Sequence, residues 1–256
     1  MDKRRLCTIM TTQVASVSKT QKVIEAVSIM GSKNIGSVLV LDSGKLEGII
    51  TERDVLKAFS QGKDLGDTYI SELMTSSVVS ASPQTPVLTA AKTMVEKRFR
   101  RLPVVEAGNV LGIVTATDLV IEMDSPHITG IASEYMTKIV GSIEKTQDIS
   151  TATKIMVEKN IGGLLVVDDG KPCGIITERD IIRGILAYGS RLSTVQVHEL
   201  STKDLLTVEV NNQISHICHL MHYYGVRRFP VVNSSEDVVG MITEKDLMNA
   251  MVNSYL

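Results

Sequence analysis

The sequence contains no tryptophan, and aromatic residues make up only 4% of its 256 positions. It also carries no excess of basic charge: the formal net charge is −2, and acidic and basic residues are interspersed. A nucleic-acid interface needs a positive field and usually aromatic side chains on which bases stack. The composition therefore argues against a nucleic-acid partner.

Long apolar runs and paired cysteines are missing as well. No stretch reaches the roughly 18 apolar residues of a membrane span, and the N-terminus has no apolar signal-peptide segment. The three cysteines (Cys7, Cys173 and Cys218) are odd in number and share no spacing, as expected of thiols in a reducing compartment. We expect a cytoplasmic protein without a membrane span, whose 43% hydrophobic residues suffice for a sizeable core.

Common enzyme motifs are also absent. The chain has no Gly-x-Ser-x-Gly, Walker A, His-Glu-x-x-His or Cys-x-x-Cys sequence, so no nucleophile, phosphate loop or metal centre is visible. One helix pattern carries His216, Cys218, His219 and His222, which fits either a metal site or a polar helix face with a packed cysteine. The sibling segments do not repeat it, which favours the polar face and no metal. We expect a non-catalytic protein without a catalytic cofactor.

What the sequence does contain is one motif, Gly-h-h-Thr-x-x-Asp (h, hydrophobic), in four copies. The copies end at Asp54, Asp118, Asp180 and Asp246, 62 to 66 residues apart. Before each copy come a short apolar strand, an amphipathic helix pattern, a β-branched run and a polar turn, and another helix pattern follows it. This order predicts an α/β (α+β) fold of four βαββα repeats, numbered 1 to 4 along the chain. We expect the leading strands near Val17, Val79, Val140 and Val208, and the last helices from Val55, Leu119, Ile181 and Leu247.

The repeats alternate in kind. Repeats 1 and 3 share Lys-Asn-Ile-Gly at residues 33–36 and 159–162, whereas repeats 2 and 4 share Arg-Arg-x-Pro-Val-Val at 100–105 and 227–232. Such alternation indicates duplication of a two-repeat module, with a boundary near residues 123–126. We expect one module at 1–125, with repeats 6–62 and 67–125, and another at 126–256, with repeats 130–189 and 193–256.

These segments, together with the Met-Thr pairs at 74–75 and 136–137, resemble the CBS domain family. In that family two repeats pack as a pseudo-twofold pair, the Bateman module. The four-repeat layout is similar to that of the nucleotide-binding gamma subunits of AMP-activated protein kinases. The resemblance implies that the four motif aspartates hold the ribose of an adenine nucleotide. It also implies that the motif threonines (Thr51, Thr115, Thr177 and Thr243) touch ribose or phosphate.

Each motif also has a purely structural interpretation. Thr-x-x-Asp at the start of a helix resembles a capping box, which stabilises a helix by about 1 kcal/mol. Both roles are compatible, because a cap does not occupy every carboxylate oxygen. The glycines at 36, 162 and 163 either allow an adenine edge to approach the backbone or serve packing.

In the family, the motif of one repeat generally faces the second strand of its partner. Applied here, Asp54 with Arg53 would face Phe99, Arg100 and Arg101. Asp180 with Arg179 would face Val226, Arg227 and Arg228. Asp118 with Thr117 would face Ile35, Gly36 and Ser37. Asp246 with Lys245 would face Ile161, Gly162 and Gly163. The first two clefts would collect three arginines each and bind charged nucleotides, unless those arginines are simply solvated.

The resulting hypothesis is a regulatory protein that binds AMP, ADP or ATP between paired repeats and signals to a downstream protein of unknown identity. The alternatives are a sensor of another adenosyl ligand, such as S-adenosylmethionine, NAD or cyclic di-AMP, and a structural adaptor with vestigial sites. The resemblance also leaves two assemblies open: a homodimer through helical faces, or a single chain whose two modules close on each other.

Overall fold

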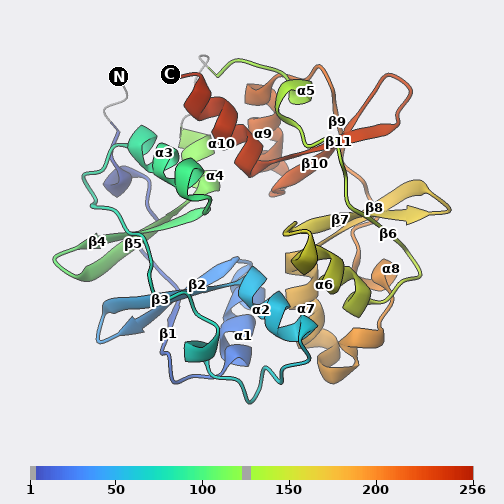
Figure 1. Ribbon diagram of the computed structural model, residues 1–256. Helices are drawn as coiled ribbons and strands as arrows, with labels where there is room; N and C mark the ends of the chain where they lie inside the picture. The colour runs from blue at the N-terminus through green and yellow to red at the C-terminus, as the bar shows by residue number, and fades with distance from the viewer. Residues whose placement is uncertain (1–3, 123–127, 256) are drawn as a thin grey trace. The chain divides into compact units, whose positions relative to one another are not determined.

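The computed structural model describes residues 4–122 and 128–255, in which the chain forms four α/β repeats (Figure 1). The predicted fold class is confirmed. Repeat 1 consists of β1 (Ser16–Val17), α1 (Val23–Lys33), β2 (Ser37–Asp42), β3 (Lys45–Thr51) and α2 (Glu52–Ser60). Repeat 2 consists of α3 (Val87–Lys97), β4 (Arg101–Glu106), β5 (Asn109–Thr115) and α4 (Ala116–Glu122).

The second half of the chain repeats this order. Repeat 3 consists of β6 (Ser142–Glu144), α6 (Ile149–Glu158), β7 (Gly163–Asp168), β8 (Lys171–Thr177) and α7 (Glu178–Tyr188). Repeat 4 consists of β9 (Val208–Glu209), α9 (Ile214–Tyr224), β10 (Arg228–Val232), β11 (Val238–Thr243) and α10 (Glu244–Asn253). Short helical segments lie between these elements: η1 (Leu6–Thr8), η2 (Ile70–Glu72), α5 (Ala132–Tyr135), η3 (Gly189–Thr194) and α8 (Val197–Leu200).

The leading strands are short, and three of the four are present. β1 and β9 include Val17 and Val208 as predicted, whereas β6 begins two residues after Val140. The strand predicted near Val79 is wrong: repeat 2 has only a single parallel bridge between Ala81 and Val104. Pro83, two residues further on, has no N–H group with which to extend this ladder.

Each hairpin sets the motif threonine opposite the first residue of the preceding strand. The four pairs are Ser37 with Thr51, Arg101 with Thr115, Gly163 with Thr177, and Arg228 with Thr243. Three hairpins close through two residues with positive φ, such as Ser43 (50°) and Gly44 (80°), the geometry of tight turns that match strand twist.

The second helix of each repeat begins three residues earlier than predicted, at the residue after the motif threonine. α2, for example, begins at Glu52 rather than Val55. The reason is that Thr51 is itself the N-cap: its backbone is extended, with φ −124° and ψ 164°, and its side-chain oxygen accepts a hydrogen bond from the Asp54 N–H. Thr177 and Thr243 have the same extended backbone before α7 and α10.

The chain divides into two compact units. The odd unit contains repeats 1 and 3 (Val14–Val78 and Gly141–Leu205). The even unit contains the N-terminal segment with repeats 2 and 4 (Met1–Gln13, Val79–Val140 and Leu206–Leu256). Each unit thus joins two repeats of the same kind. The predicted boundary near residues 123–126 lies outside the described residues, and the modules 1–125 and 126–256 stay a prediction.

Helices hold each unit together. In the odd unit α2 packs on α6 and α7, and α1 packs on α7, around buried side chains such as Met30, Leu56 and Ile181. In the even unit α10 packs on α3, α4 and α9, with Leu119 and Met251 in the core. Because burying one such side chain stabilises the fold by roughly 1.5–3 kcal/mol, two repeats of a kind support each other through their apolar helix faces.

The segments that lead into each repeat are exchanged between neighbouring repeats. Thr75 precedes repeat 2 but pairs with Ile49 of repeat 1, through backbone hydrogen bonds of 2.9 and 3.0 Å. Thr11 precedes repeat 1 but pairs with Ile113 of repeat 2. The second half repeats the exchange, with Thr137 on Met241 and Thr202 on Ile175. Each of these bridges lies within one unit: those of Thr75 and Thr202 in the odd unit, and those of Thr11 and Thr137 in the even unit.

This exchange explains the motif glycine. A Cβ atom on Gly48 would lie 3.0 Å from the Thr75 carbonyl oxygen, and one on Gly174 only 2.5 Å from that of Thr202. The sequence interpretation used two Met-Thr pairs and missed the equivalent leaders at Met10-Thr11 and Ser201-Thr202. Their signal was present, because Met10-Thr11 repeats the same dipeptide at the start of the chain.

Candidate functional site

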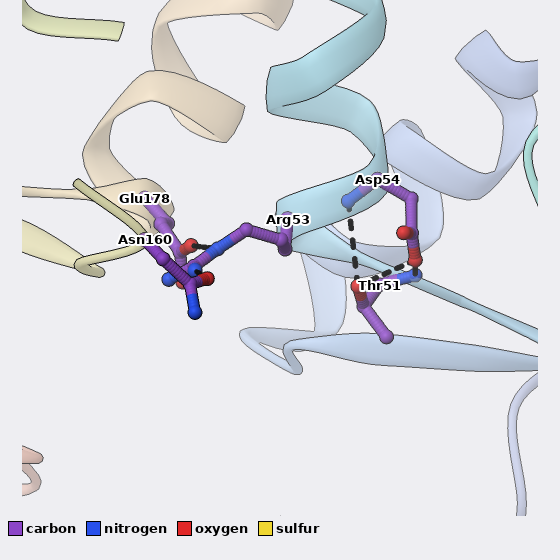
Figure 2. A network of polar contacts seen from close by, with 5 residues as sticks. All are labelled: Thr51, Arg53, Asp54, Asn160 and Glu178. Atoms are coloured by element: carbon purple, nitrogen blue, oxygen red, sulfur yellow. Dashed lines mark hydrogen bonds and ion pairs between the residues drawn. The ribbon is translucent and has the colours of Figure 1, made fainter. Parts of the chain in front are cut away.

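The four Thr-x-x-Asp motifs form one recurrent structure at strand-to-helix junctions. In repeat 1 the carboxylate oxygen Oδ2 of Asp54 accepts hydrogen bonds from the Thr51 N–H at 3.0 Å and from the Thr51 hydroxyl at 2.6 Å (Figure 2). Asp118, Asp180 and Asp246 repeat both bonds, with N–H distances of 2.7, 2.8 and 2.9 Å. The capping interpretation is therefore correct for every copy.

The cap uses only one oxygen of each carboxylate. Within residues 4–122 and 128–255, Oδ1 of Asp54, Asp118 and Asp246 accepts no hydrogen bond. Oδ1 of Asp180 lies 4.0 Å from Nη1 of Arg183. A carboxylate held by one oxygen presents the lone pairs of the other in a fixed direction, and these can accept hydrogen bonds from two neighbouring hydroxyl groups.

Each motif also binds the backbone of its own repeat. The N–H of the first helical residue donates to the carbonyl of the residue just before the first hairpin strand: Glu52 to Gly36 at 3.1 Å, and Ala116 to Arg100 at 2.9 Å. Glu178 to Gly162 and Glu244 to Arg227 repeat this bond at 3.1 Å. The structure thus brings each motif beside the Ile35–Ser37, Phe99–Arg101, Ile161–Gly163 or Val226–Arg228 segment of the same repeat. The predicted pairing with the consecutive repeat stays a prediction.

The arginine pairs of repeats 2 and 4 are half-buried. Arg101 and Arg228 begin β4 and β10, and the hairpin register sets them opposite Thr115 and Thr243. Arg100 and Arg227 carry the carbonyl groups that receive the helix N–H. All four therefore lie at the junction that carries the motif.

In the odd unit, the arginines inside the motifs reach the opposite repeat. Arg53 Nε donates to Glu178 of repeat 3, and Arg53 Nη1 donates to Asn160 (Figure 2). In the reverse direction, Arg179 Nε lies 3.4 Å from Glu52 Oε1 of repeat 1. Both glutamates are buried: 2% of the surface of Glu52 and 3% of that of Glu178 are exposed. Each therefore needs a cationic or hydrogen-bonding partner.

These glutamates are functional candidates that sequence reasoning missed. Glutamate follows the motif threonine in three of four copies, at positions 52, 178 and 244, which was the available signal. The amphipathic pattern of the helix predicts that such a glutamate is exposed to solvent. The pattern does not show that a second repeat covers the position.

The even unit carries a reduced version of this contact. Ala116 takes the place of the first glutamate, and Thr117 takes the place of the arginine. The Thr117 hydroxyl donates to Glu244, which is 6% exposed, while Lys245 is exposed. The two units therefore share one helix-end contact but differ in its charge.

Asp246 has a shifted acidity. Burial raises the pKa of its carboxyl group above the ordinary value of 3.8, and the Thr243 hydroxyl, the Thr243 N–H and the Lys245 charge oppose this rise. Burial is the largest of these effects, and it raises the pKa because it disfavours the ionised form of the carboxyl group.

The histidines of α9 do not gather into a site. His216, His219 and His222 are exposed, and Cys218 is buried in the core of the even unit. Among the described residues, no cluster of three or more His, Cys, Asp or Glu side chains has the proximity that a metal ion requires. Over the same residues, no helix has both the length and the apolar character of a bilayer-crossing segment.

Comparison with known proteins gives matches along the chain. The model of the CBS domain matches four times, at residues 6–61, 70–125, 132–187 and 197–253. The CBS domain-containing protein YhcV of Bacillus subtilis is 40% identical over 124 residues, which cover 48% of this chain and 88% of that protein. Protein MJ1225 of Methanocaldococcus jannaschii is 33% identical over 190 residues, which cover 68% of each chain.

The crystal structure of MJ1225, described as a proposed archaeal homologue of γ-AMPK, superposes with a TM-score of 0.87 at 20% identity. This alignment covers 96% of this chain and 99% of that one, so the two share a fold.

Proposed function

The chain belongs to the CBS domain family, and we propose that it is a non-catalytic regulatory protein whose Thr-x-x-Asp motifs bind adenine nucleotides, AMP, ADP or ATP. CBS domains account for most of the chain, and the sequence carries no catalytic motif. The proposed setting is the cytoplasm, and the proposed output is a change in the contact with a downstream protein.

One observation carries the ligand class: the second carboxylate oxygen of the motif aspartates. Oδ2 of Asp54 is held by Thr51, while Oδ1 accepts nothing from the described residues. A ribose offers two adjacent hydroxyl donors, and an acidic residue at a strand-to-helix junction is a known acceptor for them in other nucleotide folds. The cap thus orients an acceptor that matches the sugar.

The surroundings favour a phosphate group on that sugar. α2, α7 and α10 begin at the motif, and the positive ends of their dipoles attract anions. The half-buried Arg100–Arg101 and Arg227–Arg228 pairs add positive charge near the motifs of their own repeats.

The predicted clefts between consecutive repeats remain part of the proposal. Their support is the resemblance to the CBS domain family, in which a motif faces its partner repeat. A ligand that touched two repeats would make its binding energy depend on their relative orientation, which is how occupancy would alter the protein.

Of the two assemblies, the structure favours a single chain that supplies both helical faces. Within each unit, helices of one repeat bury their apolar side chains against helices of the other. These are the faces through which the resemblance expects a homodimer to form. A downstream protein of unknown identity completes the proposed partners.

A thermal-shift panel with AMP, ADP, ATP, NADH, S-adenosylmethionine and cyclic di-AMP tests the ligand class. A ligand that binds the native state at a hundred times its dissociation constant stabilises it by about 2.7 kcal/mol. For a chain of this size, that corresponds to roughly 2–4 °C per kcal/mol. A rise in melting temperature with adenine nucleotides supports the proposal. A rise only with another ligand means that this ligand, and not an adenine nucleotide, is the one sensed. No rise with any ligand favours the structural adaptor.

A further inference from the structure

Arg53 is turned away from the motif that contains it. Its side chain extends from the start of α2 toward repeat 3, whereas Thr51 and Asp54 lie on the other side of the helix end (Figure 2). Its Nε donates to Glu178 and its Nη1 to Asn160. The sequence neighbour of Asp54 is therefore, in space, a neighbour of repeat 3.

The two residues that Arg53 contacts belong to both parts of the repeat 3 site. Glu178 lies between Thr177 and Asp180 in the motif, and its N–H donates to the Gly162 carbonyl at 3.1 Å. Asn160 lies two residues before Gly162. Arg53 thus touches the motif of repeat 3 and the loop that packs against it.

The reverse contact is present in repeat 1. Arg179 of repeat 3 pairs with Glu52, which lies between Thr51 and Asp54, at 3.4 Å. Arg183, one helical turn later, donates from Nη2 to Asn34 at 3.0 Å. Asn34 and Asn160 have the same left-handed backbone, with φ of 54° and 52°, before equivalent loops. The exchange therefore follows the pseudo-symmetry of the odd unit.

Arg53 retains donors for a ligand. Its side chain is 20% exposed, and Nη2 donates to no residue in the described part of the chain. Glu178 holds Nε, so the guanidinium plane has a fixed orientation. A planar guanidinium with a free N–H edge is suited to a phosphate oxygen.

We propose that the phosphate-binding arginine inside the odd unit is exchanged between its two sites, so that Arg53 serves the Asp180 site and Arg179 serves the Asp54 site. This assignment rests on the proposed function and adds a residue-specific property to it. It also couples the two sites, because Arg53 belongs to the helix whose start carries Asp54.

A one-site protein tests the assignment. Asp54→Asn, Asp118→Asn and Asp246→Asn together leave Asp180 as the only motif aspartate and keep an oxygen acceptor for every cap. In this background Arg53→Gln and Arg179→Gln are compared by calorimetric titration with ATP, AMP and adenosine. We expect Arg53→Gln to weaken ATP binding about tenfold and to leave adenosine binding nearly unchanged, while Arg179→Gln has the smaller effect on ATP. A larger effect of Arg179→Gln, or equal losses for adenosine and ATP, would overturn the assignment.

Two controls separate charge from folding. Arg191→Gln removes an exposed arginine of the same unit and is expected to leave ATP binding unchanged. Arg53→Gln with Glu178→Gln removes both charges of the pair, so it is expected to restore thermal stability without restoring ATP affinity.

If the triple background does not fold, Asp54→Asn alone is used as the background. Arg53→Gln, but not Arg179→Gln, should then lower the remaining ATP binding.

The outcomes also distinguish the two proposals. If the wild-type protein binds neither adenosine nor its phosphates, both the proposed function and the exchange are wrong. If it binds them and the Arg179→Gln effect dominates at Asp180, only the exchange is wrong.

Discussion

Asp54 is held by Thr51 through one carboxylate oxygen only: Oδ2 accepts from the Thr51 hydroxyl at 2.6 Å, and Oδ1 accepts from no described residue. Under the proposed function, helix stability and ligand binding depend on different atoms of one side chain. The two roles can therefore be separated by substitution.

Asp54→Asn and Asp54→Ala should affect stability and binding differently. The side-chain oxygen of Asn can still accept from Thr51, so thermal stability should change little. The amide nitrogen that replaces Oδ1 cannot accept hydrogen bonds from ribose hydroxyl groups, so ribose binding at that site should be lost. Asp54→Ala loses the cap as well and should cost about 1 kcal/mol, or roughly 2–4 °C. Scanning calorimetry and ATP titration measure both effects. Unchanged nucleotide binding by the Asn variant would show that the motif is only a cap.

Two glycines of the odd unit should respond in opposite ways to alanine. A Cβ atom on Gly174 would meet the Thr202 carbonyl oxygen at 2.5 Å, so Gly174→Ala must displace the exchanged leader and should cost about 1–3 kcal/mol. Gly31 provides the control, because its Cβ would meet the end of the flexible, exposed Leu186 side chain at the same distance. Gly31→Ala should be neutral or should stabilise α1 by up to about 1 kcal/mol. Urea unfolding of both variants checks this, and equal losses would contradict the role given to the leader.

Asp246 should contribute a pH dependence of stability with a definite sign. Because burial raises the pKa of its carboxyl group in the folded state above 3.8, the native protein binds more protons than the unfolded chain in the window just above that value. The free energy of unfolding should therefore fall as pH rises through this window. Asp246→Asn removes this contribution. The stability difference between wild type and variant, measured without ligand from pH 3.5 to 7, should shift against the wild type as pH increases, and a flat difference would contradict the raised pKa.

The Arg53–Glu178 pair should be strongly non-additive. Arg53→Gln removes a cation from a buried carboxylate and should cost about 3 kcal/mol, whereas Glu178→Gln removes the charge that needs compensation. The double variant should be more stable than Arg53→Gln alone, with a coupling energy above about 1 kcal/mol in a double-mutant cycle by urea unfolding. Additive losses would show that the contact carries no net interaction energy.

A single chain should be sufficient for folding. Since the helical faces of the repeats already pack within each unit, light scattering at micromolar concentration should give a mass near 27.9 kDa. A mass twice that value would favour the homodimer.

Much of this protein follows from its sequence, because repeated local patterns report local structure. The spacing of Asp54, Asp118, Asp180 and Asp246 predicts four repeats, and the alternating apolar residues and Gly-containing turns predict their hairpins. The Thr-x-x-Asp cap is local as well, since all its hydrogen bonds span three residues.

Only the tertiary structure decided which repeats share a core and where the motif charges go. Glu178 and Arg53 are 125 residues apart in the chain, and the exchanged leader at Thr11 meets a strand about a hundred residues away, at Ile113. Such pairings depend on which apolar helix faces bury each other, and every repeat offers nearly the same face. The sequence by itself therefore determined the repeat, its cap and its candidate acceptor. The packing of like repeats determined that a motif arginine lies beside the other repeat's glutamate, because that glutamate is buried and requires a positive partner.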